Sequence, residues 1–148
     1  MDDASIDAMI SEIRSKSKLF DGSHVHRDDP LTPDRISLIE QRFKIQLPQQ
    51  YRRFLTTYGA GDFLYSHVYS CDPESGWSLW SETEYLGSVA EIALPFSDNG
   101  CGDYLCFGLD SGKCSDAIYW ADHESDYELT PSEYADFNDF VARVALKK

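Results

Sequence analysis

The N-terminal part of the chain carries apolar side chains at the spacing of amphipathic helices. The first apolar set consists of Ile6, Met9, Ile10 and Ile13. Residues three and four positions apart share one face of a helix, so this set predicts a helix over residues 5–18. The polar segment 21–31, which contains glycine and proline, predicts a loop after that helix.

A second helix is predicted after this loop. Thr32 followed by Pro33 is typical of a helix start, because threonine caps the free amide groups and proline suits the first turn. The apolar stripe of this helix consists of Ile36, Ile39 and Phe43.

A third helix is predicted to follow Leu47, with Pro48 in its first turn. Its apolar face consists of Tyr51, Phe54, Leu55 and Tyr58. Gly59 then suits the C-terminal cap, where a residue with positive φ is favoured.

Beyond Gly61 the pattern changes to short segments rich in aromatic and β-branched residues, which predict strands. The predicted strands are 63–69, 92–96, 104–109 and 117–121. Asn99-Gly100 and residues 110–112 are turn signals, so the last three strands are expected to form an antiparallel meander. Residues 72–85, which contain proline and glycine, predict a loop with one short strand.

The C-terminal segment predicts a final helix. Residues 130–133 read Thr-Pro-Ser-Glu and have the form of a capping box, so the helix is expected to open there. Its inward-facing residues are Tyr134, Phe137, Phe140, Val141 and Val144. The pattern predicts an α+β fold, with a mainly antiparallel sheet, helices packed on one side, three N-terminal helices and one C-terminal helix. We expect a single domain over residues 1–148, because this length suffices for one core.

Charge is distributed unevenly along the chain. The 148 residues include 13 Lys and Arg against 26 Asp and Glu, which gives a net charge of −13. Residues 1–61 are neutral overall, whereas residues 62–148 hold 4 basic and 17 acidic side chains. Between Asp62 and Ala142 only Lys113 is basic. This balance excludes a general phosphate-backbone binder, which needs clustered Lys and Arg, so we expect no nucleic-acid partner.

The sequence also predicts a cytoplasmic protein with no membrane partner. No stretch approaches the roughly 18–20 apolar residues of a membrane helix, and the acidic start Met1-Asp2-Asp3 does not resemble a secretory signal. The cysteines are Cys71, Cys101, Cys106 and Cys114. Without a secretory signal, we expect them to be reduced.

No residue set predicts catalytic or metal-binding chemistry. The cysteines lack the tight pairs of a zinc site, and His24-Val25-His26 lies in a polar loop. His67 is expected to be a half-buried histidine held by hydrogen bonds. There is no nucleophile elbow, and the glycines at 59–61 lack the third glycine of a dinucleotide fingerprint. We therefore predict that the protein is not an enzyme and carries no cofactor and no metal.

Two segments resemble a known family when they are taken together. The first is Leu47-Pro48-x-x-Tyr51-Arg52-x-Phe54-Leu55, followed by Tyr58-Gly59-Ala60-Gly61. The second is residues 94–107, which end in Gly-Asp-Tyr-Leu-Cys-Phe, and a Phe-x-x-Phe pair lies in the last predicted helix. These motifs resemble the SUKH superfamily (Smi/Knr-like domain) over residues 32–142. The extra Cys101 in the turn is a departure from the family pattern.

The resemblance implies a function. Members are commonly bacterial immunity proteins of polymorphic toxin systems, which bind and block the toxin of their own cell, and the family implies no catalytic residues. The resemblance therefore predicts an immunity protein that neutralises a cognate toxin. The acidic charge favours a toxin with a basic surface, such as a nuclease, because opposite charges speed association.

The surface expected to bind the toxin lies in the acidic half. Interface hot spots are enriched in Trp and Tyr with charges around them. The predicted partner-binding residues are Asp72, Glu74, Trp77, Trp80, Glu82, Glu84, Tyr85, Asp122, Glu124, Asp126, Tyr127 and Glu128. An equally weighted alternative for each is that the tryptophans are core residues and the carboxylates only solvate the surface.

Other functions stay open from the sequence. One is a non-catalytic regulatory or scaffold module of the cell-wall assembly regulator type, as in the fungal members. Another is a DNA mimic that occupies a nucleic-acid-binding protein through the same acidic surface. A small hydrolase is a further class, for which the sequence offers no site.

Overall fold

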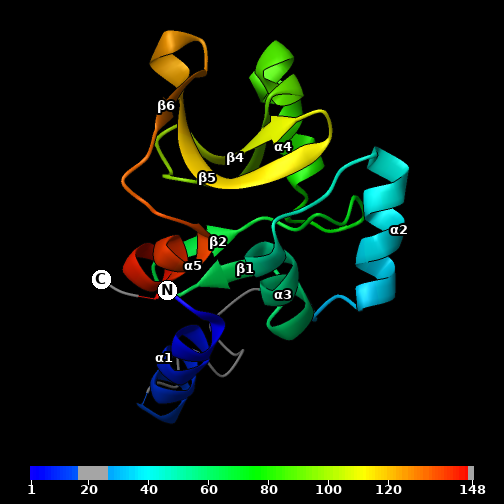
Figure 1. Ribbon diagram of the computed structural model, residues 1–148. Coiled ribbons are helices and arrows are strands. Elements are labelled where there is room, and N and C mark those ends of the chain that lie inside the picture. Colours follow the sequence, from blue (N-terminus) through cyan, green and yellow to red (C-terminus); the bar gives the residue numbers. More distant parts are fainter. Residues whose placement is uncertain (17–26, 147–148) are drawn as a thin grey trace.

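The computed structural model describes residues 1–16 and 27–146 (Figure 1). Its helices are α1 Asp3–Lys16, α2 Pro33–Phe43, α3 Gln49–Thr57, α4 Leu79–Leu86 and α5 Phe137–Phe140. Its strands are β1 Gly61–Phe63, β2 Ser66–Val68, β3 Ala93–Asp98, β4 Tyr104–Asp110, β5 Lys113–Asp122 and β6 Glu128–Pro131. Short turns of helix are η2 Gly87–Glu91, η3 His123–Ser125 and the π-helical η4 Val141–Ala145. The fold is α+β, as the sequence predicts.

Strands β3, β4, β5 and β6 form an antiparallel sheet in chain order. The predicted three-strand meander is confirmed as β3, β4 and β5, and β6 adds a fourth strand. The central pair runs from Tyr104 opposite Ala121 to Asp110 opposite Lys113. A register shift interrupts both the β3–β4 and the β4–β5 pairs, and such bulges increase bend and twist. The sheet is accordingly strongly curved in Figure 1.

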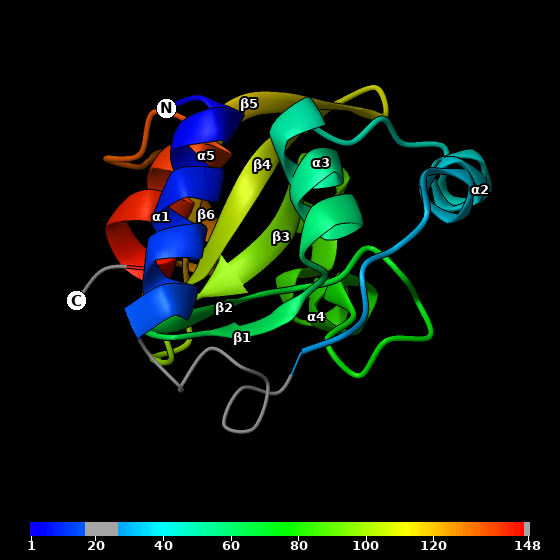
Figure 2. The same cartoon turned by 90° about the horizontal axis from the view of Figure 1, so that it is seen from below.

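The two faces of this sheet have different surroundings. We call the face that carries Leu105, Phe107 and Ile118 the inner face. Helices α3 and α5 pack against it, and α1 packs against η4 (Figure 2). Tyr104 and Cys106 point to the opposite, outer face, because side chains alternate along a strand.

Aromatic rings fill the core beneath the inner face. Phe107 of β4 stacks on Phe96 of β3 at a ring-centroid distance of 4.4 Å. Tyr51 of α3 lies 5.3 Å from Phe107, and Phe137 of α5 contacts both Tyr51 and Phe54 edge-on. Each of these rings is at most 1% exposed, so each contributes about 1.5–3 kcal/mol by burial. The predicted core role of Tyr51 and Phe54 is confirmed.

The three predicted N-terminal helices are confirmed. The Thr32 side chain accepts a hydrogen bond from the Arg35 amide at 3.1 Å, and Pro33 is the first residue of α2. Ile36 and Ile39 are buried. Pro48 lies at the cap position of α3, one residue before the helix rather than inside its first turn.

The segment 63–69 is a hairpin, where a single strand was predicted. Strands β1 and β2 pair, with Phe63 opposite Ser66, and the chain turns at Leu64 and Tyr65. Leu64 has a φ of 20°. No glycine, asparagine or proline marks this turn, so the aromatic run conceals it.

The segment 72–85 contains helix α4, where a loop with a short strand was predicted. Ser78 caps this helix by accepting a hydrogen bond from the Trp80 amide at 3.2 Å. Leu79 and Leu86 are buried on one side of it, seven residues apart. The helix is only eight residues long, too short for its periodicity to stand out against its aromatic residues.

The predicted capping box is wrong. Thr130 and Pro131 belong to β6, a fourth strand that the sequence did not predict. The helix opens later, where Asp136 caps it through the Asp139 amide at 2.8 Å. Proline is tolerated here because β6 is an edge strand. Tyr134 therefore precedes the helix, while Phe137 and Phe140 are buried in it as predicted.

Three of the four cysteines are buried away from solvent. Burial raises the pKa of the Cys71, Cys106 and Cys114 thiols to about 12, so these groups stay protonated and weakly nucleophilic. Within residues 1–16 and 27–146, no helix has the length and apolar character needed to cross a membrane. The predicted loop residues His24 and His26 lie outside the described residues.

Candidate functional site

The outer face of the sheet is flanked by two of the predicted binding segments. Helix α4 rises above this face on one side, and the β5–β6 connection with η3 rises above it on the other (Figure 1). Tyr104 of β4 lies between them. Its hydroxyl donates a hydrogen bond to Glu82 Oε2 at 2.6 Å, and its ring centroid is 5.9 Å from that of Tyr127. Glu82 and Tyr127, which are 45 residues apart in sequence, thus both lie against Tyr104.

The Glu82–Tyr104 contact fixes the charge at this point. Burial and the adjacent Glu82 carboxylate both raise the pKa of Tyr104 above its usual value. The phenol therefore remains a neutral donor towards Glu82. Tyr85 lies three residues further along α4, on the same side as Glu82, and its side chain is 65% exposed.

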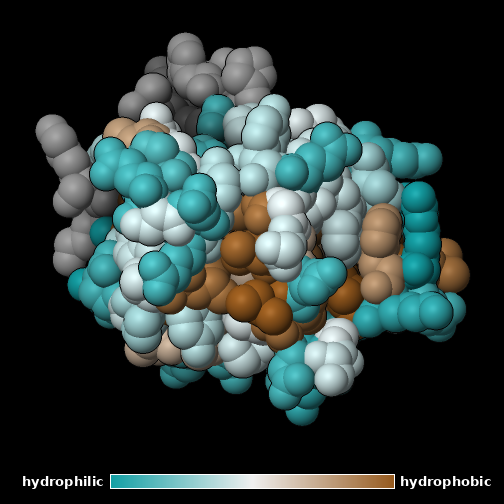
Figure 3. Space-filling model, turned by 90° about the horizontal axis from the view of Figure 1, so that it is seen from above, coloured by the Kyte–Doolittle hydropathy of each residue, from teal (hydrophilic) through white to brown (hydrophobic). Residues whose placement is uncertain are grey.

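An apolar hollow opens on the same outer face, towards the other end of β4 from Tyr104. It has a volume of about 390 Å³ and is lined by Ile92, Gly108, Leu109, Asp110, Ser115, Tyr119 and Leu129. We call it the outer-face groove. Register supports a common face, because Tyr119 pairs with Cys106 and Leu129 pairs with Ala121. In Figure 3, which looks down on this side, a band of apolar surface lies between hydrophilic borders.

Gly108 lets two lining side chains approach the sheet closely. Gly108 has no side chain above the sheet, and a Cβ there would lie 2.9 Å from Ser115 Oγ and 3.0 Å from a Tyr119 ring carbon. The β4–β5 bulge falls at the same point, between Phe107 and Leu109. A larger residue at position 108 would therefore displace the neighbouring side chains that form the floor.

The remaining predicted residues of the α4 region have structural contacts. Asp72 accepts from the Arg35 guanidinium at 2.9 Å, and Glu74 lies 3.7 Å from the same group. Trp80 stacks on Phe43 at 3.8 Å, and its indole donates to the Cys71 carbonyl at 2.7 Å.

Trp77 and Trp80 are both partly buried against the core. They therefore fit the alternative of core residues better than that of side chains exposed for binding. The Trp77 ring lies 5.7 Å from that of His67. Glu84 is exposed, but helical geometry turns it away from the side that carries Glu82.

The acidic residues of the β5–β6 connection divide between two directions. Glu124 and Asp126 are exposed at the tip of the connection. Asp122 and Glu128 are paired across β5 and β6, and both alternate with residues of the outer face. Their side chains therefore leave the sheet on its inner side. The charges of these residues follow from the sequence, but the two directions in which they point do not.

One carboxylate–histidine group has the spacing of metal ligands. Ligand atoms of Asp103, Asp122 and His123 lie within 4.8 Å of one another. His123 Nδ1 and Asp103 Oδ1 are 2.6 Å apart, and this contact raises the pKa of His123 and lowers that of Asp103. These contacts join the β3–β4 connection to the end of β5.

A second polar cluster joins β2 to β3. His67 Nε2 lies 3.0 Å from Asp98 Oδ2, and the Tyr69 hydroxyl donates to the same oxygen. Burial opposes ionisation of Asp98, but these hydrogen bonds outweigh it and lower its pKa to about 2. Burial likewise opposes the charge on His67, yet Asp98 raises its pKa overall. The predicted half-buried, hydrogen-bonded His67 is confirmed.

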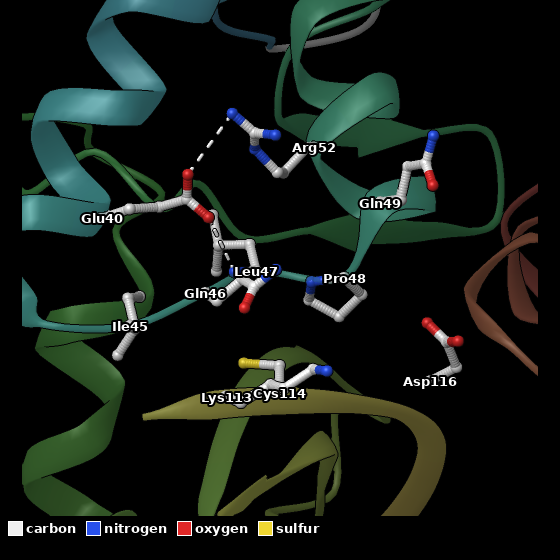
Figure 4. A pocket seen from close by; sticks show the side chains of 10 residues that line it. All are labelled: Glu40, Ile45, Gln46, Leu47, Pro48, Gln49, Arg52, Lys113, Cys114 and Asp116. Carbon is white, nitrogen blue, oxygen red and sulfur yellow. Dashed lines mark hydrogen bonds and ion pairs between the residues drawn. The ribbon is translucent and has the colours of Figure 1, made fainter. Parts of the chain in front are cut away.

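A larger cavity of about 580 Å³ lies where the predicted Leu47-Pro48 motif faces the start of β5 (Figure 4). Glu40 accepts a hydrogen bond from the Leu47 amide at 2.8 Å and pairs with Arg52 at 3.3 Å. Lys113 and Asp116 complete its charged lining. Acidic and basic side chains balance one another in this cavity. The outer-face groove differs, because its charged lining residue is acidic.

Comparison with known proteins places the fold and the family. A family model described as SMI1-KNR4 cell-wall (SUKH_6) matches residues 33–141. No curated protein matches the chain. A crystal structure of a protein from Pseudomonas syringae pv. tomato has the same fold, with a TM-score of 0.66 and 17% identity over 95% of this chain and 98% of that one. The predicted resemblance is confirmed, and the chain belongs to the SUKH (SMI1-KNR4) family.

Proposed function

We propose that this protein is an immunity protein that binds and neutralises a cognate toxin with a basic surface, such as a nuclease. Family membership supports a SUKH-domain protein, and such domains often serve as immunity proteins. The family is generally non-catalytic, so the function is binding. Direct occlusion of the toxin by a folded partner needs no chemistry from this chain.

The observation that carries the proposal is the excess of acidic side chains in residues 62–148. Residues 62–148 hold 17 acidic and 4 basic side chains, and the outer face of their sheet is flanked by Glu82 on one side and by Glu124 and Asp126 on the other. A negative field of this kind attracts a basic protein over about 8 Å at physiological salt. It raises the association rate, which is what rapid protection of the producing cell requires.

Co-expression tests this proposal. The adjacent reading frame is expected to encode a large secreted protein, and its C-terminal domain is expressed in a bacterial host with and without this chain. We expect growth arrest from the domain by itself and normal growth when both are present. Unchanged arrest in the presence of soluble, folded protein would reject the proposal for that pair.

The cell-wall description of the family model favours a regulatory scaffold as the second candidate. A scaffold would bind cellular proteins irrespective of the neighbouring toxin. The same host separates the two functions, because a scaffold leaves growth arrest unchanged.

A further inference from the structure

We propose that the outer-face groove receives one large apolar side chain of the toxin, presented by a surface segment in which basic residues flank it. This inference rests on the proposed function and specifies where and how the partner docks. The groove supplies the apolar anchor site, and the surrounding carboxylates supply attraction and orientation.

No described helix packs over the part of the outer face that holds the groove. The helices that bury the inner face lie on the other side of the sheet, and α4 with η2 covers the outer face only near β3. Ile92 at the groove wall is 54% exposed. It is one of the five large exposed apolar side chains among the described residues. A single exposed apolar residue is ordinary, but one at the wall of a largely apolar hollow is typical of a binding site.

The size and shape of the groove limit what it can receive. A volume of about 390 Å³ lies near the lower end of the roughly 300–1,000 Å³ range of small-molecule sites. That space suits one or two side chains rather than a whole helix. Ser115 and Tyr119 pack directly on Gly108 beside the β4–β5 bulge, so the shape of the floor depends on a glycine at this position.

The acidic residues in and around the groove favour a basic partner segment. Asp110 is the charged residue among those that line the groove. Glu82 lies beyond Tyr104, and Glu91 directly precedes Ile92. A second copy of this chain would bring its own net charge of −13, and a nucleic acid would bring phosphates, so both would be repelled. A protein segment with Lys or Arg beside an aliphatic or aromatic residue is attracted.

Matched alanine variants test the docking site. Ile92→Ala removes apolar surface at the groove wall, where the native side chain is 54% exposed. Leu38→Ala on α2 and Tyr65→Ala on the β1–β2 turn are controls, with side chains 58% and 55% exposed. Their similar exposure equalises the effect on stability, and thermal unfolding of each variant confirms that it is folded.

The probe is the purified C-terminal toxin domain encoded by the adjacent reading frame, and the readout is the dissociation constant with its two rates. We expect Ile92→Ala to weaken binding by about tenfold or more, which corresponds to about 1.4 kcal/mol or more. The effect should come mainly from faster dissociation, because a few buried anchor residues carry most of the binding energy of an interface. The control variants should change it less than about twofold. Ile92→Lys should weaken binding further than Ile92→Ala, since it adds a like charge to the expected basic partner.

The outcomes separate the two proposals. If the wild-type chain binds and neutralises the domain but the groove variants behave as the controls do, the groove assignment is wrong and the immunity function stands. If the wild-type chain neither binds nor protects, the immunity function fails, and the docking inference fails with it.

Discussion

At the scale of single residues, the polar contacts are the most informative. Asp98 accepts hydrogen bonds from His67 and Tyr69 and thereby joins β2 to the end of β3. Sequence reasoning predicted the state of His67 but not its partner, because the two residues are 31 positions apart. Asp98 directly precedes the turn signal Asn99-Gly100, so its place in the sequence was already explained by the turn.

The low pKa of Asp98 predicts a pH dependence of stability. Its folded pKa of about 2 lies below the usual aspartate value of 3.8, so the ionised form favours the folded state. The stabilisation is complete above about pH 4 and is lost as the pH falls through 3.8 towards 2. Asp98→Asn should cost about 1–3 kcal/mol at neutral pH.

Urea unfolding between pH 2 and 7 measures this effect. The Asp98→Asn variant should lose less stability than the wild type on acidification. Asp116→Asn, at an exposed carboxylate, should follow the wild-type curve. An identical acid sensitivity in Asp98→Asn and wild type would contradict the assignment.

Gly59 provides a second prediction at this scale. Its φ is +81°, and an added Cβ would lie 2.3 Å from the Asp28 carbonyl oxygen. Gly59→Ala should therefore destabilise the protein by about 2 kcal/mol or more, through backbone strain and a clash with the main chain.

Gly76→Ala is the control, because nothing lies within 4 Å of the added carbon and the φ of Gly76 is not positive. Thermal unfolding should show an unchanged or slightly higher midpoint for Gly76→Ala. Equal effects of the two substitutions would contradict the role of Gly59.

At the scale of elements, periodicity predicted the long helices and the central strands. It missed short elements that tertiary contacts stabilise. The long helices α1 and α2 and strands β3, β4 and β5 have clear patterns, and they form. Helix α4 and strand β6 are short, and their sequences carry competing signals. Ser78 is a typical cap, but the aromatic residues that follow it favour strand, and Pro131 in β6 gave the appearance of a capping box.

The cap of α4 can be tested directly. Ser78→Ala removes the acceptor for the Trp80 amide and should cost about 1 kcal/mol in chemical unfolding. Ser81→Ala, at an exposed position inside the same helix, should be neutral or slightly stabilising, because alanine favours helix. A neutral Ser78→Ala would show that tertiary packing holds the helix start without the cap.

At the scale of the whole molecule, the sequence predicted the charge of the site but not its apolar centre. Glu82, Glu124 and Asp126 stand out as charges in an acidic half, and the fold brings their segments to two sides of one sheet face. The groove between them escaped prediction, because Ile92, Leu109 and Leu129 come from separate segments. Each of these residues is ordinary in its own strand or turn.

The charge distribution predicts salt-dependent association. Glu124→Gln combined with Asp126→Asn should lower the association rate with the toxin domain about three- to tenfold at low salt. The loss should diminish near 0.5 M salt, where screening acts within about 4 Å. The dissociation rate should change little.

Asp29→Asn combined with Asp34→Asn is the control for this double variant. It removes two exposed carboxylates from the neutral N-terminal part of the chain. Stopped-flow mixing at two salt concentrations provides the rates. An equal reduction by both double variants would indicate that only net charge matters, and it would remove the acidic half from its steering role.

The central claim is that this chain binds a basic toxin and thereby stops it. Titration of the purified toxin domain with the purified protein, at physiological salt, measures this most directly through residual toxin activity. The account predicts that activity falls in proportion to added protein and disappears once the protein is in excess. Toxin activity that remains unchanged under a large excess of folded protein would contradict the account.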